Sequence, residues 1–154
     1  MKTSISEVTV KTLNKSMLSI CKEFYGPYEK SVEYIREVQD YLTDANISFQ
    51  PFKILGVYFD NPSEKKPEEL RSYQGVLVDT EVEVQPPFFM YDLTGQYLHT
   101  KVVGNPQEIV NIAYQSIFQY VEEHKIVPDS PFANQIMSME GDEFSVELLV
   151  RLRE

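Results

Sequence analysis

The 154-residue sequence has one cysteine, no long apolar run and few basic residues. Since Cys21 has no second cysteine to pair with, the disulfide framework of small secreted domains is excluded. A membrane-spanning helix requires about 18 consecutive apolar residues, and no segment approaches that length. The N-terminal residues alternate between polar and apolar types, unlike a signal peptide. We therefore expect a cytoplasmic protein in which Cys21 is a small buried hydrophobe.

The sequence is strongly acidic. Fourteen lysines and arginines stand against 24 aspartates and glutamates, which gives a formal net charge of -10. A nucleic-acid-binding surface needs positive charge for the phosphate backbone, and an acidic surface also repels anionic lipids. We therefore expect no direct contact with nucleic acid or with a membrane. Hydrophobic residues make up 42% of the chain, which is enough for the core of one domain.

The apolar residues predict two amphipathic helices. A helix over 27–44 begins with Pro27, because proline in the first turn loses no N–H donor that the helix needs. A second helix over 106–124 begins with Asn105 as its N-cap and Pro106 at its first position. Both helices are expected to bury one apolar face.

Alternating and β-branched segments predict the strands. Pro86 and Pro87 cannot lie inside a central strand, so residues 85–93 are predicted to be a connector. The expected strands are 5–12, 16–24, 52–59, 73–84, 96–103, 132–139 and 143–152.

The order of these elements repeats along the chain. The first copy covers 1–84 and the second 94–154, with the connector between them. Neither copy alone covers its sheet, so we predict one domain over 1–154, in which two halves surround one core with a groove between the helices. The matching landmarks are Gly26 with Gly104, Tyr41-Leu42 with Tyr120-Val121, and Ile47 with Ile126.

Four segments in this order and spacing resemble the GyrI-like family, the bacterial transcription-activator effector-binding domain. The resemblance covers nearly the whole chain and implies an α+β fold of two pseudo-symmetric β-α-β-β halves. In that fold a curved antiparallel sheet packs against two main helices, and a hydrophobic groove binds small molecules. In multidrug-responsive regulators a DNA-binding region precedes this domain. Here the first predicted strand begins at Ile5, so we expect a stand-alone member. The segments are GPYEKS at 26–31, GVYFDNP at 56–62, PEELRSYQGV at 67–76 and VELLVRL at 146–152.

Glu147 is the main candidate for a functional residue. In the regulators of this family, a glutamate on the last strand meets cationic aromatic effectors, and Glu147 is the matching position. Alternation alone directs Glu147 to solvent or to a cross-strand cation. If it lined an apolar groove, desolvation would raise its pKa and make it a candidate acid, base or cation anchor. The family has proline where this chain has Arg151, whose charge would weaken attraction for a cation.

The other candidate ligand-binding residues are aromatic, because aromatic faces stack on planar ligands and attract cations. Tyr58 and Tyr114 are candidates for the groove, with core packing as the alternative. Tyr28 is expected at the groove mouth or as a surface staple. Phe88 and Tyr91, in the connector, are expected to form either a mobile lid or a plug that joins the halves.

No metal site is expected, since His99 and His124 lie on different predicted elements without a third ligand at a suitable spacing. A more distant branch of the superfamily includes haem-binding proteins, but a lone histidine is a weak signal, and we expect no cofactor.

Three functions remain open. The first is a binding module for hydrophobic and aromatic small molecules, cationic ones among them. The second is suggested by stand-alone relatives: a hydrolase of strained, cyclopropane-containing genotoxins, in which a catalytic Glu147 activates water. The third is a gyrase-inhibitor-like protein with a protein partner such as gyrase.

Overall fold

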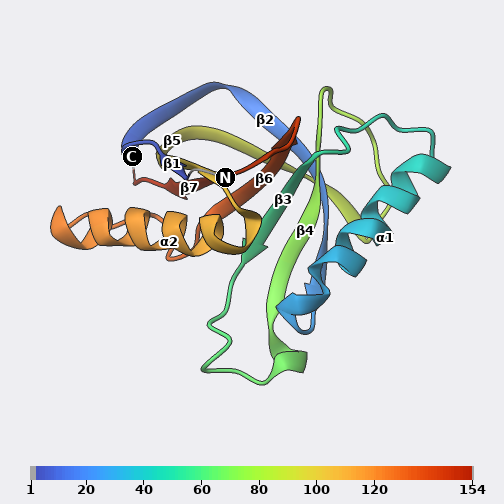
Figure 1. Ribbon diagram of the computed structural model, residues 1–154. Helices are drawn as coiled ribbons and strands as arrows, with labels where there is room; N and C mark the ends of the chain where they lie inside the picture. The colour runs from blue at the N-terminus through green and yellow to red at the C-terminus, as the bar shows by residue number, and fades with distance from the viewer. Residues whose placement is uncertain (1–2, 154) are drawn as a thin grey trace. The chain divides into compact units, whose positions relative to one another are not determined.

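The computed structural model describes residues 3–153, apart from the side chain of Glu140. The chain divides into two compact units. The α1 unit is Ser16–Leu93, and the α2 unit combines the N-terminal segment up to Lys15 with the chain from Thr94 onward. Each unit contains antiparallel strands and one α-helix, so the fold is α+β (Figure 1). Within residues 3–153, no helix combines the length and the apolar character needed to cross a membrane.

In the α1 unit, β4 pairs with an antiparallel strand on either side. Val76 of β4 lies opposite Ile20 of β2 and Ile54 of β3. The helix α1 packs against β4 (Figure 1). The elements found in this unit, wholly or in part, are β2 (Thr9–Tyr25), η1 (Tyr28–Lys30), α1 (Ser31–Asp44), β3 (Lys53–Tyr58), η2 (Pro67–Glu69), β4 (Arg71–Val78) and the start of β5 (Phe88–Gly104).

The core of the α1 unit lies between α1 and the sheet. Val38 and Leu42 are one helical turn apart, so both point to the same side and are fully buried. They pack against apolar side chains that alternate along β2 and β4: Ile20, Phe24, Val76 and Val78.

In the α2 unit, β7 lies between β5 and β6. Glu147 of β7 is opposite Lys101 of β5 on one side and Ile136 of β6 on the other. The helix α2 packs against β7 (Figure 1), and the side chain of Asn105 accepts a hydrogen bond from the Gln107 N–H at 2.9 Å, which confirms the predicted N-cap. The elements are β1 (Ser4–Ile5), the start of β2, most of β5, α2 (Pro106–Glu123), β6 (Asn134–Glu140) and β7 (Glu143–Arg151).

The core of the α2 unit likewise lies between its helix and its sheet. Ile109, Ala113 and Ile117 are spaced by four residues on α2 and are fully buried. They face alternate residues of β5 and β7, namely Leu98, Val102, Val146, Leu148 and Val150.

The two helices end in the same way. Asn46 and Lys125 have positive φ angles of 58° and 52°. In each case the next residue, Ile47 or Ile126, donates its N–H to the carbonyl five residues earlier, at 2.9 and 3.0 Å. This is the hydrogen-bonded helix end that a left-handed residue makes possible. The paired isoleucines of the predicted repeat therefore have the same local geometry.

The prediction of two separate N-terminal strands, 5–12 and 16–24, is wrong. One strand, β2, runs from Thr9 to Tyr25, and β1 is only Ser4–Ile5. Residues 14–16 are exposed and polar, so they interrupt the apolar pattern without interrupting the backbone strand.

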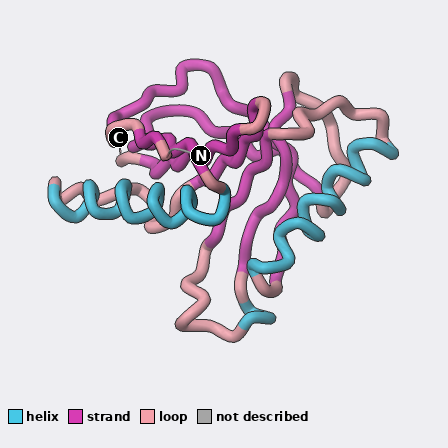
Figure 2. The backbone as a smooth tube through the Cα atoms, in the orientation of Figure 1, coloured by secondary structure: helices cyan, strands magenta, loops and turns pink. Residues whose placement is uncertain are grey.

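Two boundaries around the expected connector are also wrong. The strand predicted over 73–84 ends at Val78, and β5 begins at Phe88 and not at residue 96. The two prolines exclude strand pairing only up to Pro87, and the residues after them are extended. The loops, pink in Figure 2, include 59–66, which leads to η2, and 79–87.

Candidate functional site

Glu147 lies on the face of the α2-unit sheet that is turned away from α2. Its neighbours Val146 and Leu148 are fully buried in the core beneath α2, and successive side chains of a strand point to opposite faces. The Glu147 side chain is 22% exposed. It is therefore half-buried, within reach of solvent.

Three basic groups surround the Glu147 carboxylate. Nε2 of His99 is 2.8 Å from Oε1 of Glu147, and Nζ of Lys11 is 4.0 Å from the same oxygen. Lys101 is directly opposite Glu147 across the β5–β7 pair, so the two side chains lie on one face. Glu147 therefore has the cross-strand basic partner that strand alternation allowed, and the nearest basic group is His99.

The pKa of Glu147 is lowered from its ordinary value. The main cause is the hydrogen bond from His99, which favours the charged carboxylate; burial acts in the opposite direction, and the charges of His99, Lys11 and Lys101 lower the pKa further. The raised pKa expected for an apolar groove is therefore not observed. An ionised Glu147 can accept hydrogen bonds or take up a proton, but it has no proton to donate.

Apolar side chains lie next to this polar group. In antiparallel pairs, directly opposed residues share a face, which puts Leu149 of β7 and Ile136 of β6 on the same side as Glu147. Both are about 1% exposed. We call this side of the α2-unit sheet, with His99, Lys101, Ile136, Glu147 and Leu149, the Glu147 face.

Arg151 is engaged elsewhere. Its guanidinium donates hydrogen bonds to the Thr94 carbonyl and the Tyr97 hydroxyl, each at 3.2 Å, and stands 5.8 Å from the centre of the Tyr97 ring. Its Nε is 3.7 Å from Asp129. These contacts direct the Arg151 charge toward Thr94, Tyr97 and Asp129.

Tyr114 lies on the other side of the α2-unit sheet. Its ring packs against the core beneath α2, stacked at 6.1 Å from Phe118, and its hydroxyl donates to the Gln135 side chain at 3.2 Å. Gln135 is opposite Leu148 and so shares the α2 side. The sheet therefore separates Tyr114 from Glu147, and the core-packing alternative describes Tyr114.

Tyr28 and Tyr58 contact each other in the α1 unit, edge to face with ring centres 4.8 Å apart. The Tyr28 hydroxyl donates to the Arg71 carbonyl at 2.9 Å and accepts the Asp60 N–H at 3.0 Å. Tyr28 thus links the start of the α1 region to the loop after β3 and the start of β4.

A buried polar cluster lies beside Tyr58, beneath the first turn of α1. The Gln74 side-chain amide donates to the hydroxyls of Ser31 and Ser72, each at 3.2 Å, and the Tyr58 hydroxyl is 3.4 Å from that of Ser31. Gln74 is fully buried, and its Oε1 has no hydrogen-bond partner. Sequence patterns gave no signal for this cluster, because its members come from different elements that only the fold brings together: Ser31 from α1, Tyr58 from β3, and Ser72 and Gln74 from β4.

Phe88 and Tyr91 are separated by strand alternation. Phe88 stacks on Tyr41 of α1 with ring centres 4.0 Å apart, within the core of the α1 unit. Tyr91 contacts Tyr73 edge to face at 5.5 Å. The lid alternative is wrong for these two residues, because both belong to β5 and point to opposite faces. The plug alternative stays a prediction.

Tyr73 is the centre of an aromatic cluster that the sequence did not predict. Phe59, Phe89 and Tyr91 all meet its ring edge to face. The Arg71 guanidinium is 4.4 Å from the centre of the Phe59 ring, and its Nε is 2.7 Å from Glu23.

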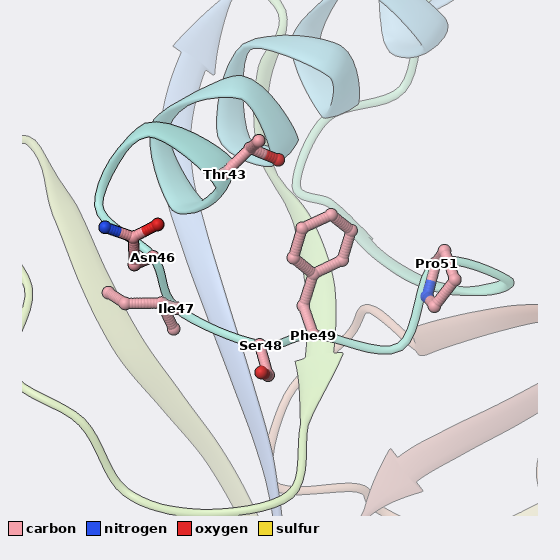
Figure 3. A pocket seen from close by; sticks show the side chains of 6 residues that line it. All are labelled: Thr43, Asn46, Ile47, Ser48, Phe49 and Pro51. Atoms are coloured by element: carbon pink, nitrogen blue, oxygen red, sulfur yellow. The ribbon is translucent and has the colours of Figure 1, made fainter.

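An open hollow of about 440 Å³ lies beside the C-terminal end of α1. Figure 3 shows the ring of Phe49 between Thr43 and Pro51. Its other lining residues are Asn46, Ile47 and Ser48. Among the described residues, no three His, Cys, Asp or Glu side chains converge as they would around a metal ion.

Comparisons with known proteins extend this description. No protein family and no curated protein matches the sequence. Solved structures do match. The C-terminal domain of EcmrR has a TM-score of 0.65 at 12% identity, over 99% of this chain and 100% of that chain. A hydrolase from Listeria innocua has a TM-score of 0.56 at 10% identity, over 94% and 91%.

EcmrR in its complex with DNA gives a TM-score of 0.64 at 11% identity, over 98% of this chain but 58% of that one. The chain therefore spans little more than half the length of that protein. At such low identities these likenesses concern the fold alone. The α+β fold is consistent with the GyrI-like fold that the sequence resemblance implied.

Proposed function

We propose that this chain is a small-molecule-binding module and that its ligand, a hydrophobic aromatic compound, contacts the Glu147 face. The observation that supports this most directly is the half-buried, ionised Glu147 next to His99, with the apolar stem of the exposed Lys11 beside it. Ligand sites combine an apolar surface with a few oriented polar groups. The likeness of the fold to a domain of EcmrR, a regulator that binds DNA, is compatible with an effector-binding role.

Affinity should be modest. Burying about 200–300 Å² of apolar ligand surface contributes roughly 5–8 kcal/mol, and association costs about 4 kcal/mol or more. Burial alone therefore gives a dissociation constant of about 1 mM at best. A hydrogen bond to Glu147 or His99 would bring it into the range of tens to hundreds of micromolar, since one charged hydrogen bond contributes about 1.5–3 kcal/mol.

A thermal-shift screen with neutral planar aromatics, followed by mass spectrometry of each stabilising compound, tests the proposal. A ligand that binds only the folded protein raises the melting temperature as its concentration rises. We expect such shifts, with the compound recovered intact. His99→Gln should reduce them, whereas His124→Gln, a matched change at the exposed end of α2, should not. An absence of shifts across the screen would overturn the proposal.

A second candidate is a hydrolase of a strained ring compound, favoured by the His99–Glu147 contact. The ionised carboxylate can take a proton from water while the water oxygen bonds to a ring carbon. The strained carbon–carbon bond then breaks, and its electron pair moves to a conjugated carbonyl of the substrate and is protonated there. One of the solved neighbours is described as a hydrolase.

Turnover distinguishes the two candidates. An enzyme would yield more than one equivalent of the ring-opened product, and Glu147→Gln would abolish it while Glu143→Gln, on the same strand, would not. Binding at one equivalent with no product would exclude the hydrolase and leave the binding module.

A further inference from the structure

We propose that the polar end of the ligand is an anion, in the simplest case an aromatic carboxylate, held by Lys101, Lys11 and His99 around Glu147. This rests on the proposed small-molecule function and specifies its ligand class. It differs from the cationic ligand that the sequence resemblance suggested.

The basic groups around Glu147 outnumber the one carboxylate that they surround, and this favours an anionic ligand. Glu147 is one carboxylate, and it is already met by the imidazole of His99 at 2.8 Å and by the ammonium of Lys11 at 4.0 Å. Lys101 faces it from the opposite strand, and its charge contributes to the lowered pKa of the carboxyl. Two ammonium groups and an imidazole thus share one acceptor, so this part of the face has an excess of positive charge and of N–H donors.

A cationic ligand would have to displace these partners and would then lie close to two like charges. A carboxylate avoids both difficulties, because it can accept hydrogen bonds from the lysines that Glu147 leaves partly unused. Lys11 is 41% exposed and Glu147 22% exposed, so an incoming group can reach both. The net charge of -10 opposes the binding of an anion only weakly, since charges more than about 8–10 Å away are screened at physiological salt.

The remaining charges near this face do not reverse the balance. Glu143 lies on the same side of β7, but it is four residues from Glu147, about 13 Å along the strand and beyond the screening length at physiological salt. Arg151 lies on the same strand and the same side as Glu147, which adds a further positive group. Its partner Asp129 is 3.7 Å away and offsets it. Leu149 and Ile136 share the face with the lysines but are about 1% exposed, so the apolar part of an aromatic acid would lie against the alkyl stem of the exposed Lys11.

Three compounds with one aromatic body and different charge test this inference on the whole chain: 2-naphthoate, 2-naphthylmethanol and 2-naphthylmethylammonium. Isothermal titration at pH 7.5 should show naphthoate binding at least tenfold more tightly than the ammonium compound. Raising the salt concentration should weaken the binding of naphthoate and leave the binding of the alcohol unchanged.

Three variants sharpen the test. Lys101→Met should weaken naphthoate binding at least fivefold with no change for the alcohol. Lys66→Met, in the loop before η2, makes the same change of net charge at a distance and should have no effect. Glu147→Gln should strengthen naphthoate binding, whereas an anchor for cations predicts above all that this change weakens binding of the ammonium compound. Circular dichroism confirms that each variant is folded.

The outcomes separate this inference from the proposed function. Equal binding of all three compounds, or tighter binding of the ammonium compound, overturns the anion preference and leaves the small-molecule function in place. Unchanged naphthoate binding by Lys101→Met also overturns it. No binding of any of the three compounds counts against both.

Discussion

His99 and Glu147 lie diagonally across the β5–β7 pair, with Nε2 of the imidazole 2.8 Å from Oε1 of the carboxylate. The two residues are 48 positions apart in the sequence and lie on different strands. It gives Glu147 a basic partner inside the protein, so any ligand of this face meets a carboxylate that is already hydrogen-bonded. The chemistry of the face therefore depends on the groups around Glu147 as much as on Glu147 itself.

Glu147→Gln should make stability less sensitive to acid. The folded protein lowers the pKa of this carboxyl below its usual value of 4.5, so its charge stabilises the fold fully above about pH 4.5 and loses that effect as the pH falls through the lowered pKa. We expect the wild type to be more stable by about 1–2 kcal/mol at pH 7. Urea denaturation between pH 7 and pH 3 should show this difference shrinking, while Glu143→Gln has no such effect.

Glycine at the helix ends should stabilise the protein, and by different amounts. Lys125 has a φ of 52°, a conformation that costs a residue with a side chain about 1–2 kcal/mol. Glycine avoids this cost but loses more conformational freedom on folding. Lys125→Gly should therefore raise the free energy of unfolding by roughly 0.5–1 kcal/mol. Asn46 has a φ of 58° but is a residue that tolerates this conformation, so Asn46→Gly should gain less. Melting temperatures measure both changes. A loss at Lys125 would contradict the left-handed geometry of that helix end, and an equal gain at the two sites would contradict the greater tolerance of asparagine for it.

Gly75→Ala should be among the most damaging single substitutions. A Cβ at Gly75 would stand 2.0 Å from the Ile20 carbonyl oxygen and 2.8 Å from the Cα of Cys21, both on the paired strand β2. Backbone cannot move aside cheaply, so we expect a loss of about 3 kcal/mol or more. Gly141→Ala is the control, since its φ of 62° costs about 1–2 kcal/mol but its Cβ meets no atom within 4 Å. Similar losses for the two variants would contradict the packing of β2 on β4.

Cys21 should be unreactive in the folded protein. It is fully buried, and burial raises the pKa of its thiol to about 12, so almost no reactive thiolate forms at neutral pH. Labelling with 5,5′-dithiobis(2-nitrobenzoic acid) should be slow in buffer and fast in denaturing urea. Rapid labelling without denaturant would show that the β2 region opens easily.

The regular parts of the fold were predictable from local signals. Pro106 after Asn105 and the spacing of Ile109, Ala113 and Ile117 give α2 its start and its buried face, and the structure confirms both. Helix spacing and alternation depend on near neighbours in the sequence, which is why they can be recognised without a structure. The pseudo-symmetry of the two β-α-β-β halves stays a prediction, although the matched ends at Ile47 and Ile126 agree with it.

The candidate site was harder to predict because its contacts join distant strands. Glu147 could be singled out by its place on the last strand, but His99 and Lys101 become its neighbours only through the register of β5 on β7. A shift of one residue would turn these side chains to the other face. Phe88 was also hard to place from local sequence. The two prolines before it suggested a connector, but Phe88 belongs to β5 and stacks on Tyr41.

The most direct test of the account is to map a bound ligand by NMR on isotope-labelled protein, with 2-naphthoate and 2-naphthylmethanol as probes. We expect chemical-shift changes and intermolecular nuclear Overhauser contacts centred on the Glu147 face, with Lys11, His99 and Lys101 affected most. Changes centred on the hollow lined by Thr43, Phe49 and Pro51, or no changes at millimolar ligand, would contradict it.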